Sequence, residues 1–355
     1  MTADAVGGVW NYSLDLARGL IANGYRVTLA VMGPAPSEHQ RQDASGLDLR
    51  YRDFRLEWME NPWGDVRRAG HWLLDLEQEL APAVIHLNGY AFGSLKTAAP
   101  KVVVAHSCVF SWWEAVRRES PGPEWSEYRQ RVERGIHSAD FLVAPSQAML
   151  AYIAKHYGTP AKNCSVISNG RDRRLYEPRP EEPFIFAAGR FWDRAKNLEC
   201  LARAADLTPW PVYVAGDSGQ APTVKFLGPL SPDTLRDWLA RAAIYCLPAR
   251  YEPFGLSILE AALSGCALVI GDIPSLRENW DGAALFVPPD DPRIVADTLR
   301  SLIDSKSKRE DLQCRARRRA RRFSLTRMVN AYVRLYETLL RRNQAATVLK
   351  SSTSL

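Results

Sequence analysis

Residues 251–261 of this 355-residue chain read Tyr251-Glu252-Pro253-Phe254-Gly255-Leu256-Ser257-Ile258-Leu259-Glu260-Ala261. The proline and glycine predict a loop around the first carboxylate, whereas the residues from Ser257 to Leu263 favour a helix. We therefore expect Glu252 to lie in the loop and Glu260 to lie inside the helix. Free backbone N–H groups at such a helix start can bind phosphate or sugar hydroxyls. An isolated pair of glutamates with this spacing would more often be solvated on a surface helix.

Short apolar runs alternate with segments of helical periodicity in both halves of the chain, which is typical of parallel sheets built from βαβ units. In the first half the runs are Arg26–Met32, Val84–Leu87, Lys101–Ala105 and Phe141–Ala144. In the second half they are Phe184–Ala188, Val212–Ala215, Ile244–Leu247 and Ala267–Ile270. A chain of this length also exceeds the usual size of one hydrophobic core. The sequence therefore predicts two α/β domains, with ligands at the carboxyl ends of their strands.

Turn formers and charged residues replace the periodic pattern between Asn169 and Pro183. We place the interdomain linker in this stretch. The first domain is therefore expected over residues 1–172 and the second over residues 173–325.

A last helix is expected over residues 326–345, followed by a tail over residues 346–355. One apolar stripe runs along this helix, so it must dock on another element. The stripe comprises Met328, Tyr332, Leu335, Tyr336 and Leu339. Because the helix follows the second sheet, we expect it to pack back across the domain junction.

The formal net charge of +6 at pH 7 is concentrated in one run of arginines. The run comprises Arg315, Arg317, Arg318, Arg319, Arg321 and Arg322. One interpretation is a solvated helix face, and the other is peripheral contact with anionic membrane headgroups. No zinc-finger spacing, RNP-like aromatic motif or basic region joined to heptads is present, so we expect no nucleic-acid partner.

The six cysteines are scattered without a C-x-x-C pair, and most lie in apolar stretches. That usage is typical of a reduced cytosolic protein. No apolar run approaches the ~20 residues that span a bilayer, and the N-terminus lacks a basic region followed by an apolar signal core. We therefore expect a cytoplasmic protein, with the inner face of the membrane as its only candidate membrane contact.

The segment at 251–261 resembles the E-x7-E motif of the retaining family-4 glycosyltransferases. Further matches follow in the expected order along nearly the whole chain: Gly7-Gly8-Val9, Ala105-His106-Ser107, Pro145-Ser146, Ser168-Asn169-Gly170, and Gly189-Arg190 with Lys196-Asn197. The resemblance implies the GT-B fold, in which two Rossmann-like, doubly wound α/β domains face each other across a cleft and the C-terminal helix crosses the junction.

The resemblance also implies a retaining transfer of a sugar from a nucleotide diphosphate sugar to a glycan, lipid-linked or small-molecule hydroxyl. The acceptor would lie on the first domain and the donor on the second. Two alternatives remain. One is other chemistry on the same fold, a phosphorylase or a sugar-nucleotide epimerase. The other is an inactive basic scaffold.

Arg190 and Lys196 flank the loop after the apolar run Phe184–Ala188. Together they could neutralise a diphosphate, whose negative charge grows as its bond to the sugar breaks. As an isolated pair they would be ordinary surface charges. The sequence contains no Asp-x-Asp and no His/Cys cluster at metal-ligand spacing. We therefore expect metal-independent chemistry without a cofactor.

By resemblance, Glu260 binds the two ribose hydroxyls and Glu252 holds the donor sugar, because a carboxylate acts only as an acceptor. His106 would hydrogen-bond the sugar or align the acceptor, although a lone histidine at a strand end is more often structural. The expected catalytic set is thus Glu252, His106, Arg190 and Lys196.

The expected donor-binding residues extend from the glycine loops to the helix after Glu252. They are Gly7, Gly8, Arg190, Lys196, Asp217, Leu227, Phe254, Gly255, Leu256, Ser257 and Glu260. For Asp217 a turn-forming role is an equally good interpretation. Near Leu227 we expect backbone contacts to the base.

Trp112 and Trp113 come shortly after His106 and are candidates for stacking on an acceptor sugar, with a space-filling core role as the alternative.

Gly7 and Gly8 allow the backbone to approach a ligand closely, or they simply form a tight turn. An amphipathic helix is expected after them. Its apolar face comprises Trp10, Leu14, Ala17 and Ile21. Few residues precede the glycines, so either the true start lies a few residues upstream of Met1 or this domain tolerates a shortened first strand.

Overall fold

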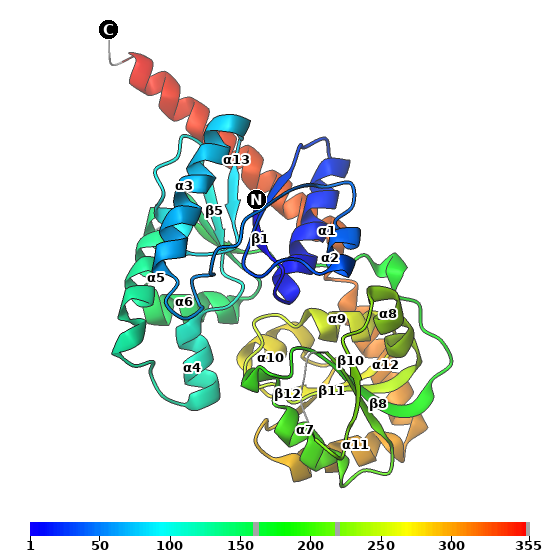
Figure 1. Ribbon diagram of the computed structural model, residues 1–355. Helices are drawn as coiled ribbons and strands as arrows, with labels where there is room; N and C mark the ends of the chain where they lie inside the picture. The colour runs from blue at the N-terminus through cyan, green and yellow to red at the C-terminus, as the bar shows by residue number, and fades with distance from the viewer. Residues whose placement is uncertain (159–162, 217–220, 353–355) are drawn as a thin grey trace. The chain divides into compact units, whose positions relative to one another are not determined.

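The computed structural model describes residues 1–158, 163–216 and 221–352, which form two compact units (Figure 1). The first unit contains residues 1–111, residues 120–168 and the chain from residue 326 onwards. The second contains residues 112–119 and 169–325. Both units are built on parallel sheets, as the alternating pattern predicts.

The first unit holds two parallel sheets, ordered β1-β2-β3 and β4-β5-β6-β7. Its strands are β1 (Thr2–Asp4), β2 (Thr28–Met32), β3 (Asp48–Tyr51), β4 (Ile85–Leu87), β5 (Lys101–Val104), β6 (Phe141–Ala144) and β7 (Cys164–Val166). Its helices are α1 (Gly8–Ala22), α2 (Glu38–Asp43), α3 (Trp63–Leu80), α5 (Ser126–Ser138), α6 (Gln147–Tyr157) and α13 (Leu325–Ser352), together with the start of α4 (Val109–Arg117). Asn88 joins the two sheets, because it donates hydrogen bonds from its backbone N–H and its side-chain amide to Thr2.

Helix α13 packs within the first unit. All five residues of its predicted apolar stripe are buried, which confirms that prediction. The helix lies so close to α1 that a Cβ added to Gly19 would meet Cγ2 of Val329 at 2.2 Å.

Helix α1 buries Trp10, Leu14 and Ala17 as predicted, but Ile21 is 42% exposed. That part of the prediction was wrong. Ile21 lies in the last turn of α1 and faces a cavity of about 790 Å³ instead of the core. The cavity lies at the amino ends of β1, β2, β4 and β5, so it is at the edge of the sheets opposite to the one where ligands of such sheets bind.

The second unit holds one parallel sheet of six strands in the order β10-β9-β8-β11-β12-β13. Its strands are β8 (Glu182–Ala188), β9 (Val212–Ala215), β10 (Lys225–Gly228), β11 (Ala242–Leu247), β12 (Ala267–Gly271) and β13 (Leu285–Val287). Its helices are α7 (Leu198–Ala205), α8 (Pro232–Arg241), α9 (Leu256–Leu263), α10 (Pro274–Trp280), α11 (Pro292–Ile303) and α12 (Lys306–Ala320). Counted from β8, this order is 3-2-1-4-5-6, the order of dinucleotide-binding Rossmann domains.

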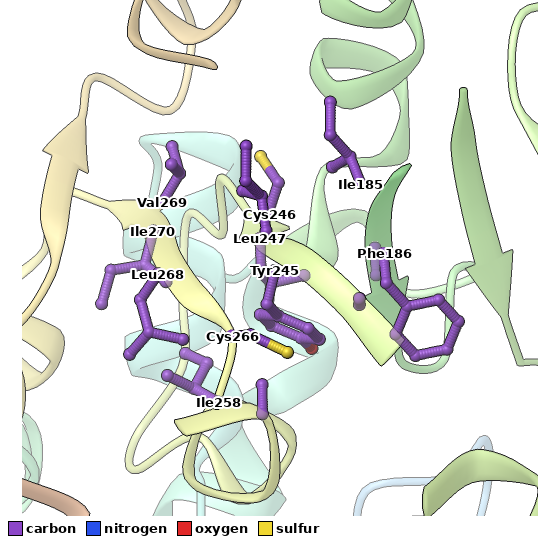
Figure 2. Close-up of a cluster of buried hydrophobic side chains, with 14 of the residues drawn as sticks. Ile185, Phe186, Tyr245, Cys246, Leu247, Ile258, Cys266, Leu268, Val269 and Ile270 are labelled. Atoms are coloured by element: carbon purple, nitrogen blue, oxygen red, sulfur yellow. The ribbon is translucent and has the colours of Figure 1, made fainter. Parts of the chain in front are cut away.

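The core of the second unit explains why its strands read as continuous apolar runs. Strand β11 lies between β8 and β12, with Ile244 in register with Ile185 on one side and Ala267 on the other. Figure 2 shows side chains of these three strands around Tyr245, together with Ile258 from α9. A parallel strand covered on both faces has no solvent side, so no polar alternation is expected.

All eight apolar runs predicted as strands are strands, with ends that differ from the prediction by at most two residues. Before the glycines, β1 has three residues and pairs with β2 from Thr2 to Asp4. Within the described residues, no helix is both long enough and apolar enough to cross a bilayer.

The two chain segments at the border of the second unit run side by side. Arg171 forms a parallel bridge with Ser324, and the N–H of Leu325 donates to the Arg171 carbonyl at 3.0 Å. Gly170 makes this approach possible, because a Cβ there would lie 2.5 Å from the Ser324 carbonyl oxygen.

Candidate active site

The candidate site of the second unit lies where the strand order of its sheet reverses. Strands β8 and β11 are neighbours there, although two strands and two α-helices lie between them along the chain. Ligands of open α/β sheets bind outside the carboxyl ends of the strands at such a point. Gly189 directly follows β8, and the loop with Glu252 follows β11.

Lys196 and Glu252 meet at this point as an ion pair between Nζ and Oε2. Their side chains are only 14% and 12% exposed. The next residue fixes the lysine: Asn197 adopts a left-handed conformation and donates from Nδ2 to the carbonyls of Pro248 at 2.9 Å and Pro289 at 2.5 Å. The loop after β8 is thereby tied to the chain that follows β11.

The start of α9 lies beside this ion pair. Gly255 precedes the helix with φ 88° and offers no side chain to cap it. Glu252 Oε1 accepts from the Gly255 N–H at 2.9 Å, so the same carboxylate contacts both the lysine and the entry to the helix. The first N–H groups of α9 have no capping side chain, and such groups bind anions well.

Glu260 lies one turn inside α9, as predicted, and is 6% exposed. Its Oε1 forms an ion pair with Nη2 of Arg171, which is also buried. The carboxylate is therefore held in the site by a cation from the border segment. Its second oxygen has no partner among the described side chains.

The other donor-side residues lie around the same strand ends. Arg190 is half-buried, and its guanidinium lies 5.3 Å from the ring centroid of Trp192. Leu256, Ser257 and Leu227 are half-buried. Phe254 is buried against Phe323, so a ligand can meet its backbone but not its ring. Asp217 lies outside the described residues.

Trp112 and Trp113 are half-buried and lie in the segment that is grouped with the second unit. Trp112 donates from Nε1 to Asp193 Oδ1 at 2.8 Å. The guanidinium of Arg117 lies 4.3 Å from the centroid of the Trp113 ring. One indole is thus held by a carboxylate and the other is stacked by a cation.

The predicted residues of the first unit lie at its own strand ends. Gly7 precedes α1 with φ 76°, a conformation that favours glycine, and no side chain caps that helix. His106 lies just beyond β5 and is half-buried. Its Nε2 is 2.9 Å from Asn88 Oδ1. Burial lowers the pKa of His106 to about 3, so the ring is neutral at pH 7.

Two arginines of the basic run bind backbone carbonyls. Arg315 donates to the Gly282 carbonyl at 2.9 Å, and Arg319 donates to those of Asn279 at 2.7 Å and Glu278 at 2.9 Å. These carbonyls are at and beyond the end of α10, where helices leave acceptors unpaired. Among the described residues, no three His, Cys, Asp or Glu side chains gather into a metal-binding group.

Comparison with known sequences places the two units in one family. Residues 6–175 match Glycosyltransferase Family 4, and residues 182–305 match Glycosyl transferases group 1. The chain belongs to the family-4 glycosyltransferases. One match covers the first half of the chain and the other lies in the second half.

Curated relatives of this family-4 glycosyltransferase are similar over part of their length. A D-inositol 3-phosphate glycosyltransferase of Corynebacterium efficiens is 27% identical over 267 residues, which are 63% of this chain and 62% of that protein. Sulfoquinovosyl transferase SQD2 of Arabidopsis thaliana is 26% identical over 287 residues, which are 68% of this chain and 54% of that protein. The chain thus matches less than two thirds of either relative.

Solved structures share the fold over nearly the whole chain. Sucrose-phosphate synthase of Thermosynechococcus elongatus superposes with a TM-score of 0.77 at 18% identity, covering 96% of both chains. HepE of Anabaena in complex with UDP-glucose has a TM-score of 0.77 at 18% identity, covering 95% of this chain and 100% of that one. The family-4 glycosyltransferase therefore has the GT-B fold of two Rossmann-like domains.

Sequence reasoning missed two residues of this family-4 glycosyltransferase. Arg171 directly follows the Ser168-Asn169-Gly170 motif, and Asn88 directly follows the predicted strand Val84–Leu87. A polar residue at the end of an apolar run is the signal that selected His106, and it would have selected Asn88 too. For Arg171 the sequence carries no sign of its partner, because 89 positions separate it from Glu260.

Proposed function

We propose that this family-4 glycosyltransferase transfers a sugar from a nucleotide diphosphate sugar to a hydroxyl group, with retention of the anomeric configuration and without a metal ion. The observation that carries the proposal is the Lys196–Glu252 ion pair at the switch point of the sheet, beside the uncapped start of α9. A cation for the diphosphate, a carboxylate for the sugar and free N–H groups are the parts that such a transfer requires.

The proposed reaction uses these groups in one displacement. The bond between the sugar C1 and the diphosphate oxygen breaks, while the acceptor oxygen bonds to the same face of C1. The acceptor proton passes to the departing phosphate oxygen. Negative charge grows on the leaving diphosphate, and Lys196, Arg190 and the first N–H groups of α9 would stabilise it. A bound diphosphate would then take the place of Glu252 as the partner of Lys196.

Glu252 would turn to the hydroxyls of the donor sugar once the diphosphate holds Lys196. The second oxygen of Glu260 would accept from the ribose hydroxyls, while Arg171 keeps the first. In the first unit, His106 would contact the sugar or the acceptor.

The acceptor is proposed to be a glycan, a lipid-linked or a small-molecule hydroxyl. The name of the Corynebacterium relative makes D-inositol 3-phosphate the first acceptor to test. We place the reaction in the cytoplasm, with contact to the inner face of the membrane through the basic run.

The test is incubation of the purified chain with a panel of UDP-, GDP- and ADP-sugars, with release of free nucleotide as the readout. One donor should be hydrolysed slowly, faster with the right acceptor, and equally in EDTA. NMR of the product should show the anomeric configuration of the donor. Release of sugar phosphate in the presence of phosphate would indicate a phosphorylase. No turnover of any donor by the folded protein, an inverted product, or activity that EDTA abolishes and Mg²⁺ restores would refute the corresponding part of the proposal.

A further inference from the structure

A row of buried and half-buried polar side chains connects α13 with His106 in the first unit. The hydroxyl of Tyr336 is 2.6 Å from Nδ1 of His86, and Nε2 of His86 is 3.1 Å from Oδ1 of Asn88. The same oxygen is 2.9 Å from Nε2 of His106. Asn88 is therefore a single acceptor shared by two imidazole rings, at the carboxyl ends of the neighbouring strands β4 and β5.

The surroundings of Asn88 fix which way its amide points. Its Nδ2 is 2.7 Å from the carbonyl oxygen of Thr2 and 3.1 Å from Oγ of Ser13. A carbonyl oxygen can only accept, so the NH₂ group must face Thr2 and the amide oxygen must face the histidines.

An amide oxygen also only accepts, so both Nε2 atoms that face it carry a proton. The two tyrosines around His86 are compatible with this assignment: the Tyr336 hydroxyl can donate to Nδ1, and the Tyr12 hydroxyl, 3.3 Å from Nε2, can accept. Burial lowers the pKa values of both histidines, so neither ring takes up a second proton at pH 7.

We propose that Asn88 is a positioning residue that holds His106 as the neutral Nε2–H tautomer, so that Nδ1 of His106 accepts a hydrogen bond from a substrate hydroxyl. The inference deepens the proposed function and rests on it for the identity of the ligand. Among the described residues, none bonds to Nδ1 of His106, and this half-buried residue lies at the ligand-binding edge of the sheet.

The tautomer determines which chemical groups His106 accepts as ligands. A sugar or acceptor hydroxyl can donate to a bare Nδ1. A phosphate or carboxylate oxygen cannot, because it has no proton to give. His106 in this state thus selects hydroxyls and disfavours anions. Lys196 and Arg190 have the opposite preference, because they are cations proposed to bind the diphosphate.

The test is long-range ¹H–¹⁵N correlation NMR of the full chain labelled at its histidines, without any ligand. Signals are assigned by their loss in His106→Gln and His86→Gln. Wild-type His106 and His86 should both show the Nε2–H pattern at pH 7. In Asn88→Ala, His106 should change to a mixture of both tautomers. The matched control is Ser13→Ala. It removes the hydroxyl that accepts from Asn88 Nδ2 but keeps Asn88 Oδ1, which faces His106. The His106 pattern should therefore stay unchanged.

A wild-type His106 that is Nδ1–H or doubly protonated would overturn the proposal, and this spectrum decides even if Asn88→Ala fails to fold. An unchanged pattern in folded Asn88→Ala would overturn it as well. With an active donor, Asn88→Ala should lower kcat/KM about tenfold, as expected for one lost neutral hydrogen bond, while Ser13→Ala stays within about twofold. Failure of every nucleotide sugar to react would refute the proposed function but would leave the tautomer result standing.

Discussion

Lys196 and Glu252 illustrate how single residues make the site from an otherwise ordinary Rossmann loop. Both side chains are largely desolvated, so each one stabilises the charge of the other in the free protein. The left-handed Asn197 places the lysine, and Gly255 places the glutamate beside the helix start.

Replacing Lys196 with Ala should lower kcat by about 10²-fold or more, with a smaller effect on the donor KM, because the cation matters most as charge develops on the leaving group. Arg190→Ala should act in the same direction. Arg194→Ala is the matched control, since this exposed arginine lies on the same short turn as Lys196 and should keep normal kinetics. The measurement is the steady-state kcat and donor KM of the three folded variants, compared with those of the wild type. Near-normal kcat in Lys196→Ala would show that the diphosphate is stabilised by other groups.

His106 should make the folded state sensitive to acid. Burial lowers the pKa of His106 to about 3, whereas the unfolded chain takes up its proton near pH 6.5. Between these values the unfolded state binds more protons, so the stability that the neutral ring provides is present above about pH 6.5 and is lost as the pH falls towards 3.

The slope from this one group is at most about 1.4 kcal/mol per pH unit, and partial exposure of the ring reduces it. Urea unfolding at several pH values should therefore give a shallower decline of stability below pH 6.5 for His106→Gln than for the wild type. His71→Gln serves as the comparison, because His71 is exposed and its removal should leave the decline unchanged. Equal slopes for wild type and His106→Gln would contradict a buried neutral ring.

At the scale of elements, the sequence predicted strands best where they are buried on both faces. The eight predicted runs were largely apolar, and seven of them are strands with a neighbour on both sides, whereas β4 lies at the edge of its sheet. The strands β3, β7, β10 and β13 were missed, and each of them lies at the edge of its sheet. None of the four is fully buried, and Asp48–Tyr51 alternates between exposed and half-buried residues. Whether a strand lies at an edge depends on the order of strands in the sheet, and the local hydrophobic pattern does not reveal that order.

In the candidate site, too, some residues could be predicted from the sequence and others could not. Residues in recognisable local settings, such as Glu252 before a helix and His106 after a strand, could be selected from the sequence. Their partners could not, because the Arg171–Glu260 pair and the sharing of Asn88 by two histidines depend on how distant segments pack. Ile21 failed for a related reason, since periodicity does not tell where along a helix the core ends.

Gly216 and Gly228 provide a matched test of how tightly the strand ends at the donor site are packed. Both have positive φ, 138° and 70°, so alanine is strained at either position. At Gly216 a Cβ would also lie 1.9 Å from the Gly189 carbonyl oxygen, whereas at Gly228 nothing lies within 4 Å. Gly228→Ala should reduce the free energy of unfolding by about 1–2 kcal/mol. Gly216→Ala should reduce it by clearly more. Urea unfolding of both variants measures the difference, and equal losses would show that the backbone at Gly216 can move away from Gly189 at no cost.

At the scale of the whole molecule, the net charge of +6 is not spread evenly but lies largely on α12 and the residues after it. Arg315 and Arg319 donate hydrogen bonds to backbone carbonyls at and beyond the end of α10. These two arginines therefore have a structural role in the second unit. Arg317, Arg318 and Arg321 are exposed. The basic run therefore has members that bind backbone carbonyls and members that are exposed, and the exposed ones are those available to an anionic surface.

If the exposed arginines contact a membrane, each should contribute about 1 kcal/mol to binding of an anionic surface. Replacing Arg317, Arg318 and Arg321 together by Gln should therefore weaken binding to vesicles that contain anionic lipid by about 10²-fold at low salt. The control replaces Arg67, Arg203 and Arg293 by Gln, which removes the same charge from exposed positions elsewhere. Co-sedimentation with anionic and with neutral vesicles, at two salt concentrations, separates the cases. Binding that both triple variants lose equally reflects net charge alone, and binding to neutral vesicles would exclude an electrostatic contact altogether. Only a selective loss in the first variant, which salt reproduces in the wild type because exposed charges are screened, supports a membrane contact through the basic run.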